Sequence, residues 1–365
     1  MNYPDIQRRS SRAVNVGGVV IGSGAPVSVQ SMTNTATADA EATIGQVRRL
    51  AEAGAQLVRV AVPTKADTAV LRRIVKESPV PIVADVHFHF DRALEAVAAG
   101  VAKIRLNPGN LRDRDQVRKV IAAADDAGVV IRVGVNEGSI IDRTDDARHA
   151  EELARPLPEL MADKMAEYLE VFDQAGFKNL VLSAKSHDAV TTVAVNRLLA
   201  ARWDYPLHLG VTHAGTAETG AVRSAAALGT LLCEGIGDTV RISYAGDPVT
   251  EVTAGLELLY SLRLRPRRGV ELIACPTCGR TLMDLSPIVE GIRAELADVD
   301  FPVSVAVMGC VVNGPGEAEG ADVAICAGKG KAVLYSRGKR VRTVGLDEMV
   351  SAVVEEVRHI ASERD

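Results

Sequence analysis

Residues 103–136 read KIRLNPGNLRDRDQVRKVIAAADDAGVVIRVGVN, and this stretch contains the unit that decides the fold of the first 260 residues. It predicts a strand over Lys103–Asn107, a helix over Val117–Ala127 and a second strand over Val130–Asn136. The apolar residues of the helical segment recur at spacings of three and four, which gives the helix one buried face. Because a return to a parallel strand needs a crossover of this length, the stretch predicts one β-α-β unit of a parallel sheet.

The same alternation of a short apolar strand and an amphipathic helix continues in both directions along the chain. The eight predicted strands are Val27–Met32, Leu57–Val62, Pro81–Phe88, Lys103–Asn107, Val130–Asn136, Asn179–Lys185, Pro206–Thr212 and Thr239–Ala245. Eight such units in about 250 residues predict a closed (β/α)8 barrel of the TIM type. An open doubly wound sheet is the alternative, and it is less favoured because no Gly-x-Gly-x-x-Gly follows the first strand.

The composition excludes several classes of function. Hydrophobic residues make up 47% and charged residues 24% of the 365 residues, which is typical of a globular protein. Aromatic residues make up 3% and the net charge is −5, which argues against single-stranded and duplex nucleic acid as partners. No apolar run is long enough to cross a membrane. The N-terminus has no apolar signal core, so we expect a cytoplasmic protein.

Polar and basic residues lie at the ends of the predicted barrel strands. In a TIM barrel these ends form the face that carries the active site, so we expect a cationic pocket there. Any single Arg is expected to pair with a nearby carboxylate, but four arginines and a lysine together favour a phosphorylated or diphosphorylated small substrate. The candidate residues are Arg59, Asp85, His87, Arg105, Asn107, Arg132, Asn136, Lys185, Arg241 and Ser243.

The barrel pattern ends with a predicted helix over Glu251–Leu262, so residues 1–262 form the first predicted domain. Residues 263–269 are rich in Arg and contain Pro and Gly, which is typical of an exposed linker. Residues 270–365 predict a small mixed α/β domain. Its predicted elements are strands over Val270–Ala274, Val303–Met308, Val323–Ala327 and Ala332–Tyr335, a helix over Ile288–Leu296 and a C-terminal helix from Leu346.

Four of the five cysteines lie in this second domain. Cys275 and Cys278 form a Cys-x-x-Cys motif, and Cys310 follows another predicted strand, so three thiols are expected at one end of a sheet. A structural zinc site, a redox-active pair and an iron–sulfur cluster all use such cysteines, and the spacing leaves the choice between zinc and iron–sulfur open. Cys326, in a predicted buried strand, is a possible fourth ligand, but it is expected to be a core residue, as is Cys233 on a barrel helix.

Several motifs together resemble the 4-hydroxy-3-methylbut-2-en-1-yl diphosphate synthase family. They are VSVQSM (27–32), NPGN (107–110), PLHLGVT (206–212), GIGDT (235–239), ACPTC (274–278) and GCVVNGPGE (309–317). The resemblance extends over nearly the whole chain. It implies a (β/α)8 barrel joined to a small iron–sulfur domain of the sulfite/nitrite reductase type. It also implies reduction of 2-C-methyl-D-erythritol 2,4-cyclodiphosphate with electrons from flavodoxin or ferredoxin, and a homodimer in which the cluster domain of one subunit covers the partner's barrel.

The resemblance also assigns roles to residues. It implies that Cys275, Cys278, Cys310 and Glu317 hold a [4Fe–4S] cluster, with the weakly bound Glu317 as the exchangeable ligand. All ten candidate pocket residues fall on family substrate-binding positions. His213 stands where the family usually has a glutamate that is thought to donate a proton. His213 is therefore the candidate donor, with Glu218 as an alternative, although a rim histidine without a catalytic part fits the position equally.

A competing interpretation makes the chain a TIM-barrel transferase or binding protein for a phosphorylated or pterin-like ligand, with zinc holding the cysteines together. A third interpretation, a scaffold protein whose cysteines stabilise the fold, is disfavoured by the predicted cationic pocket.

Overall fold

The computed structural model describes residues 5–86, 89–106, 114–140, 154–212, 214–276, 278–281, 283–310 and 314–363. The chain divides into two compact units, Met1–Arg265 and Pro266–Asp365, and each is described by itself. The division falls within residues 263–269, where the sequence predicts a linker. Across the described ranges, no helix is both long and apolar enough to cross a membrane.

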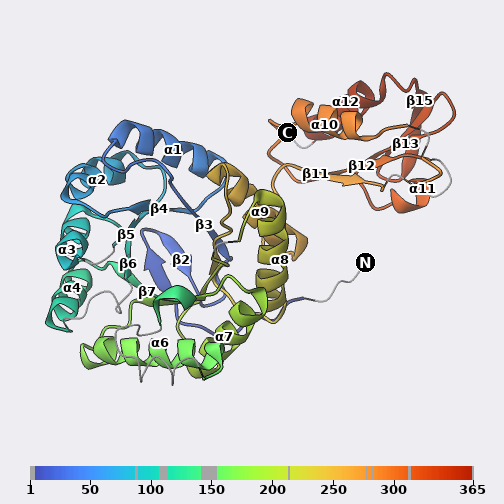
Figure 1. The fold of residues 1–365 in the computed structure, drawn as a ribbon. Coiled ribbons are helices and arrows are strands. Elements are labelled where there is room, and N and C mark those ends of the chain that lie inside the picture. The colour runs from blue at the N-terminus through green and yellow to red at the C-terminus, as the bar shows by residue number, and fades with distance from the viewer. Residues whose placement is uncertain are drawn as a thin grey trace. The chain divides into compact units, whose positions relative to one another are not determined.

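The first unit is a barrel of eight parallel strands (Figure 1). Along the chain they are β3 (Ser28–Met32), β4 (Leu57–Ala61), β5 (Ile82–Asp85), β6 (Lys103–Leu106), β7 (Val130–Asn136), β8 (Leu180–Lys185), β9 (His208–Leu209) and β10 (Thr239–Val240). The hydrogen-bonded order is β8-β7-β6-β5-β4-β3-β10-β9, and a parallel bridge between Leu182 and Leu207 joins the two ends of the sheet. The predicted (β/α)8 fold is therefore confirmed. The last two strands are much shorter than the sequence predicts.

Helices surround the barrel on its outer face (Figure 1). They are α1 (Ala40–Glu52), α2 (Lys65–Glu77), α3 (Phe90–Ala99), α4 (Arg114–Asp126), α6 (Leu157–Gln174), α7 (Ala189–Arg202), α8 (Ala217–Cys233) and α9 (Pro248–Ser261). The predicted stripe of α4 is buried against the sheet and comprises Val117, Val120, Ile121 and Ala124. Asp39, Asp188 and Asp247 cap the N-termini of α1, α7 and α9 through their side chains, which satisfies backbone N–H groups at the helix starts.

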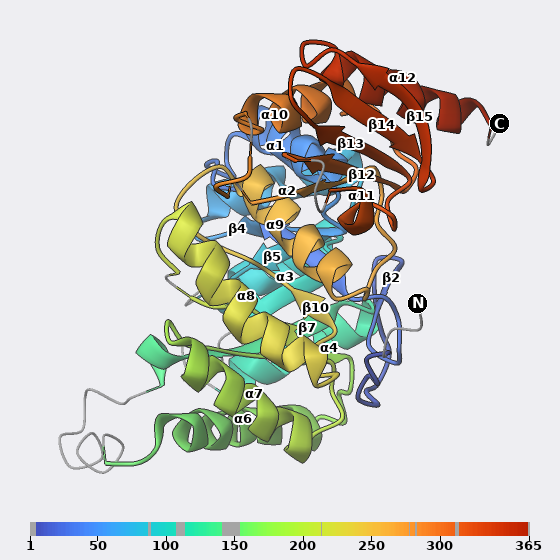
Figure 2. The ribbon, with the colours of Figure 1, turned by 90° about the vertical axis from the view of Figure 1, so that its right-hand side faces the viewer.

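A short hairpin that the sequence analysis does not predict closes one end of the barrel. Its strands, β1 (Val14–Val16) and β2 (Val19–Ile21), pair antiparallel. The turn between them is Gly17-Gly18, and both glycines have positive φ, as a two-residue hairpin turn requires. The apolar side chains of the hairpin pack against residues near the starts of four barrel strands, namely Leu57, Val83, Val130 and Val181. Figure 2 shows β2 at this end of the barrel, so the C-terminal ends of the strands form the other end.

The second unit contains a five-stranded sheet in the order β11-β12-β13-β14-β15. The strands are β11 (Val270–Ala274), β12 (Val303–Met308), β13 (Val323–Ala327), β14 (Ala332–Ser336) and β15 (Lys339–Val344). The first three are parallel, and the last two pair antiparallel. Helices α10 (Ser286–Glu295) and α12 (Met349–Ser362) share one hydrophobic core with this sheet. The sequence predicts four of the five strands. It misses β15, a charged and mostly exposed strand at the sheet edge.

Candidate active site

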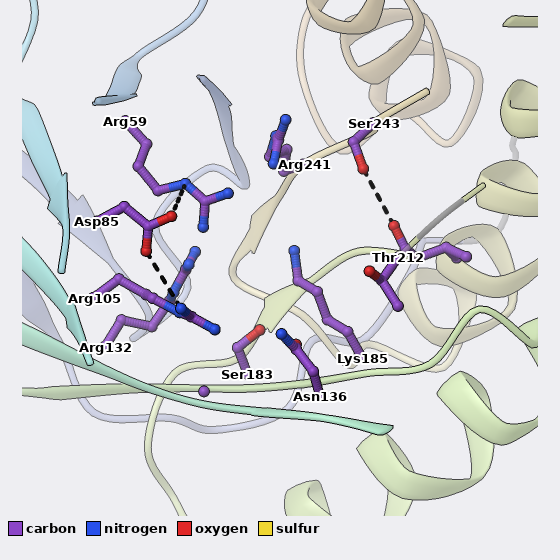
Figure 3. A pocket seen from close by; sticks show the side chains of 12 residues that line it. Arg59, Asp85, Arg105, Arg132, Asn136, Ser183, Lys185, Thr212, Arg241 and Ser243 are labelled. Carbon is purple, nitrogen blue, oxygen red and sulfur yellow. Dashed lines mark hydrogen bonds and ion pairs between the residues drawn. The ribbon is translucent and has the colours of Figure 1, made fainter. Parts of the chain in front are cut away.

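A pocket of about 170 Å³ lies at the C-terminal ends of the barrel strands. Among the described residues, five basic side chains and one carboxylate line it, and Figure 3 shows the basic groups pointing toward the same space. The lining residues are Arg59, Asp85, Arg105, Arg132, Gly134, Asn136, Ser183, Lys185, Val211, Thr212, Arg241 and Ser243.

The structure brings most of the predicted pocket residues together. Eight of the ten candidates line the cavity: Arg59, Asp85, Arg105, Arg132, Asn136, Lys185, Arg241 and Ser243. The other two, His87 and Asn107, lie outside the described residues. Ser183 and Thr212, which the sequence analysis did not assign to the site, also line it. Ser183 could have been found, because it lies two residues before Lys185 on the same strand and therefore faces the same side.

Two buried carboxylates interact with three of the four arginines. Asp85 lies between two of them, with Oδ2 3.6 Å from Arg59 Nε and Oδ1 3.4 Å from Arg105 Nη1. Glu251, which projects from α9, lies with Oε2 3.6 Å from Arg241 Nη2. Arg132 is almost fully buried, and its Nε and Nη1 atoms have no hydrogen-bond partner among the described residues. Among the described residues, the pocket therefore holds more positive charge than its carboxylates balance.

The pKa values of the pocket groups reflect their burial first and this excess of positive charge second. Burial, and then the neighbouring cations, lower the pKa of Arg132 and of Lys185 well below their ordinary values. Burial, followed by the charge of Arg59, lowers the pKa of Arg241 to about 10. Burial raises the pKa of Glu251, although the nearby Arg241 counteracts the effect. An anion that entered the pocket would favour the charged form of every basic group in it.

A second layer of polar residues lies inside the barrel at two positions that the sequence analysis missed. Lys103 on β6 and His208 on β9 are fully buried. Lys103 Nζ and His208 Nδ1 have no hydrogen-bond partner among the described residues, while His208 Nε2 lies 3.4 Å from Lys185 Nζ. The period of two along a strand could have identified Lys103, because it precedes Arg105 by two residues and faces the same side.

Glu137, Ser186 and His187 form a hydrogen-bonded group where β7 and β8 end. Glu137 lies in a short 3-10 turn, Glu137–Ser139, directly after Asn136. Its Oε2 accepts hydrogen bonds from Ser186 Oγ at 2.6 Å and lies 2.8 Å from His187 Nδ1. Although burial raises the pKa of Glu137, the hydrogen bonds from Ser186 and His187 lower it below its ordinary value. These hydrogen bonds connect the loops that follow β7 and β8, two strands that line the pocket.

In the second unit, three thiols line one cavity of about 110 Å³. Cys275 follows β11, Cys310 follows β12, and Cys278 completes the Cys-x-x-Cys motif. The backbone N–H of Gly309 donates to Cys275 Sγ at 3.1 Å. A hydrogen bond from the backbone of Arg280, together with the Thr281 hydroxyl, lowers the pKa of Cys278 and so favours the thiolate that binds metals. These donors fit a soft metal centre, although the described residues contain no group of three or more potential ligands close enough to hold an ion.

The other predicted residues of this site have different outcomes. Glu317 ends the short helix α11 (Gly314–Glu317), and its side chain lies outside the described residues, as does the whole of His213. Glu218 lies in the first turn of α8. Cys326 is buried in β13, where burial, then the nearby Cys310 and Cys275, raise its pKa to about 11.

The prediction that Cys233 is a core residue is wrong, because its side chain is exposed. Cys233 is the last residue of α8, and the buried face of that helix comprises Gly220, Ser224, Ala227, Leu228, Leu231 and Leu232. Cys233 therefore lies directly beyond the buried face and points away from the barrel.

Comparisons with known proteins assign both units to one family. Residues 11–256 match the GcpE TIM-barrel domain, and residues 271–359 match the GcpE protein C-terminal domain. The chain is 45% identical over 361 residues to the 4-hydroxy-3-methylbut-2-en-1-yl diphosphate synthase (flavodoxin) of Acidothermus cellulolyticus, covering 99% of this chain and 91% of that protein. Proteins of the same name from Geobacter sulfurreducens and Aquifex aeolicus are each 44% identical to it. The matches cover 98% and 97% of this chain and 99% and 98% of those proteins. The chain therefore belongs to the GcpE family of 4-hydroxy-3-methylbut-2-en-1-yl diphosphate synthases.

Proposed function

We propose that this chain reduces 2-C-methyl-D-erythritol 2,4-cyclodiphosphate to 4-hydroxy-3-methylbut-2-en-1-yl diphosphate, and that the barrel pocket binds the diphosphate. The observation that carries the proposal is the pocket lined by four arginines, a lysine and a single carboxylate among the described residues. A guanidinium group offers paired donors that match phosphate oxygens, and a diphosphate supplies the negative charge that this pocket lacks.

The pocket residues have different roles in binding and orienting the substrate. Arg132, with two nitrogens lacking partners among the described residues, is the strongest candidate for direct contact with phosphate oxygens. Asp85 holds Arg59 and Arg105 in position from between them. Ser243 and Thr212 lie at the pocket wall, where their hydroxyl groups suit hydrogen bonds to the sugar-derived part of the substrate.

The second unit would hold the iron–sulfur cluster through Cys275, Cys278 and Cys310, with Glu317 as the proposed fourth ligand. Support comes from the three thiols that line one cavity and from the N–H group that already donates to Cys275 Sγ. When bound, a [4Fe–4S] cluster supplies electrons and one iron with an exchangeable ligand. Cys326 is fully buried in an apolar cluster of β13 and is not among the described residues that line this cavity, which disfavours it as a ligand.

The proposal extends to the proton donor, the electron donor and the assembly. His213 is the proposed proton donor and Glu218 its alternative, on the strength of the family resemblance. The relatives' name supports a flavodoxin as the electron donor, with ferredoxin as the alternative. The resemblance also supports a homodimer, whose mass can be measured by light scattering after size-exclusion chromatography.

The function is tested with protein purified without oxygen. We expect a brown protein whose visible absorption bleaches on reduction, and which forms the allylic diphosphate from the cyclic diphosphate when reduced flavodoxin is supplied. Arg132→Met should remove most of this turnover while leaving the iron content unchanged. A colourless preparation with stoichiometric zinc would overturn the proposal in favour of a zinc-stabilised barrel protein.

Two variants test the residues outside the pocket. Glu317→Ala should retain more cluster than Cys310→Ala but change the electron paramagnetic resonance spectrum of the reduced protein. An unchanged spectrum contradicts the ligand assignment. His213→Ala should bind substrate and turn over slowly, and unchanged turnover would remove His213 from the mechanism.

A further inference from the structure

Lys185 and His208 form a pair of titratable side chains at the inner wall of the pocket. Lys185 lies at the end of β8 and lines the cavity, while His208 lies on β9 and is fully buried. Lys185 Nζ is 3.4 Å from His208 Nε2. Gly210, directly after β9, leaves room for this contact, because a Cβ atom there would lie only 2.7 Å from Lys185 Nζ. The position of Lys185 Nζ beside His208 Nε2 therefore depends on the lack of a side chain at residue 210.

Among the residues that the structure describes, the groups that face this pair are mostly cations. Arg59 projects from β4, Arg105 from β6 and Arg132 from β7, and Arg241 directly follows β10. The buried Lys103 on β6 lies near His208. In the described ranges the facing carboxylates are Asp85 on β5, held by Arg59 and Arg105, and Glu251 on α9, beside Arg241.

Such surroundings oppose a positive charge on the pair while the pocket lacks an anion. Burial and these cations lower the pKa values of both Lys185 and His208 well below their ordinary ranges. Two basic nitrogens this close also repel each other when both are charged, so they titrate as a unit. A neutral His208 can accept a hydrogen bond from Lys185 through Nε2, which leaves its Nδ1 protonated.

We propose that the Lys185–His208 pair takes up a proton when the diphosphate of the substrate enters the pocket. This inference rests on the proposed function, because it takes the cyclic diphosphate as the ligand. The negative charge of the ligand opposes the field of the surrounding arginines, and so favours an ammonium group on Lys185 that donates to neutral His208. Binding and protonation are then coupled, and each strengthens the other.

The substrate is well suited to reveal this coupling. Each phosphorus of a cyclic diphosphate carries a single acidic oxygen, which is ionised throughout the neutral range. The ligand therefore neither gains nor loses protons near pH 7. Any proton that is exchanged on binding belongs to the protein.

The experiment is isothermal titration calorimetry of the holoenzyme with the substrate, without an electron donor so that no turnover occurs. Titrations in buffers of different ionisation enthalpy give the number of protons exchanged, and the series is repeated across a range of pH. Proton uptake should be absent below the pKa of the pair in the free enzyme and approach one proton per substrate above it. Proton uptake should disappear again above the pKa of the pair in the complex. Within this window the affinity should fall by up to tenfold per pH unit as the pH rises.

Variants assign the proton to the pair. Lys185→Met should abolish the proton uptake. His208→Leu, which removes the hydrogen-bond acceptor, should move the pH window of proton uptake to lower pH, whereas His208→Gln should shift this window less. Lys178→Met is the matched control, because Lys178 is an exposed lysine paired with Asp173 and lies before the start of β8. This control should retain the full uptake.

Several outcomes would overturn the inference. Substrate binding by the wild-type enzyme without proton exchange at any pH refutes it without any variant and leaves the proposed function standing. Undiminished uptake in a folded Lys185→Met protein assigns the proton to another group, such as Lys103. Failure of the substrate to bind the wild-type enzyme would refute the proposed function together with the inference.

Discussion

Replacing Asp85 by Asn should destabilise the barrel strongly. The side chains of Asp85, Arg59 and Arg105 are 7%, 11% and 6% exposed, and the carboxylate lies 3.6 Å and 3.4 Å from the two guanidinium groups. Asp85→Asn leaves both arginines buried without their shared counter-charge. Removal of one partner of a buried ion pair costs about 3–5 kcal/mol in the free energy of unfolding, because an uncompensated charge remains.

Asp204→Asn provides the matched control for this change. Asp204 pairs with Arg12 at 2.7 Å, a shorter distance, but the two side chains are 57% and 38% exposed. Water already solvates such a pair, so its loss should cost only about 0–1 kcal/mol. The two substitutions make the same chemical change and differ mainly in burial.

Urea denaturation followed by tryptophan fluorescence measures both variants. Trp203 is the single tryptophan of the chain and belongs to the barrel unit, so its emission reports the unfolding of the barrel without that of the second unit. The reasoning is refuted if Asp85→Asn costs no more than Asp204→Asn at equal denaturant dependence.

Three further predictions follow from single side chains. Gly210→Ala should lower kcat/KM roughly 10–100-fold in the anaerobic assay, because the new Cβ would lie 2.7 Å from Lys185 Nζ and 2.8 Å from a backbone oxygen. Unchanged kinetics would contradict the described packing. Cys326→Ser should destabilise the second unit by about 1–3 kcal/mol in thermal unfolding, since it buries a hydroxyl group, whereas the exposed Cys233→Ser should stay within about 0.5 kcal/mol. The pKa of Glu137 is lowered in the folded protein, so its contribution to stability is present above the pKa of the unfolded chain and is lost as the pH falls through the folded value. Glu137→Gln should therefore flatten the acid side of a stability-versus-pH curve, and an unaltered curve would remove this residue from the acid response.

The sequence predicts the barrel because its periodicity is local. Each strand and helix carries its own pattern of apolar residues, and eight repeats leave few alternatives for a parallel sheet. The first hairpin was missed because Val14–Ile21 forms an element only through its packing on four barrel strands far away in the chain. The edge strand β15 was missed for the opposite reason, since its charged, exposed residues lack any apolar alternation.

The pocket was predictable to a similar degree, and for a related reason. Strand ends are visible in the sequence, so the arginines and Asp85 could be assigned to one face before their distances were known. Their partners were harder to identify. Glu251 reaches Arg241 from a helix outside the sheet, and His208 meets Lys185 only because the last strands close the barrel. Cys233 was misplaced because a shift of one residue along a helix turns a side chain by about 100°, which separates a buried position from an exposed one.

The hairpin at the start of the barrel has a kinetic consequence. Because β1 and β2 cover the N-terminal end of the barrel with apolar side chains, the pocket that the described residues form lies at the opposite end, where the strands terminate. A substrate that binds this pocket and the product formed from it occupy the same space at that end of the barrel. Product that is still bound in the pocket excludes the next substrate molecule. We therefore expect the product to be a competitive inhibitor with respect to the substrate.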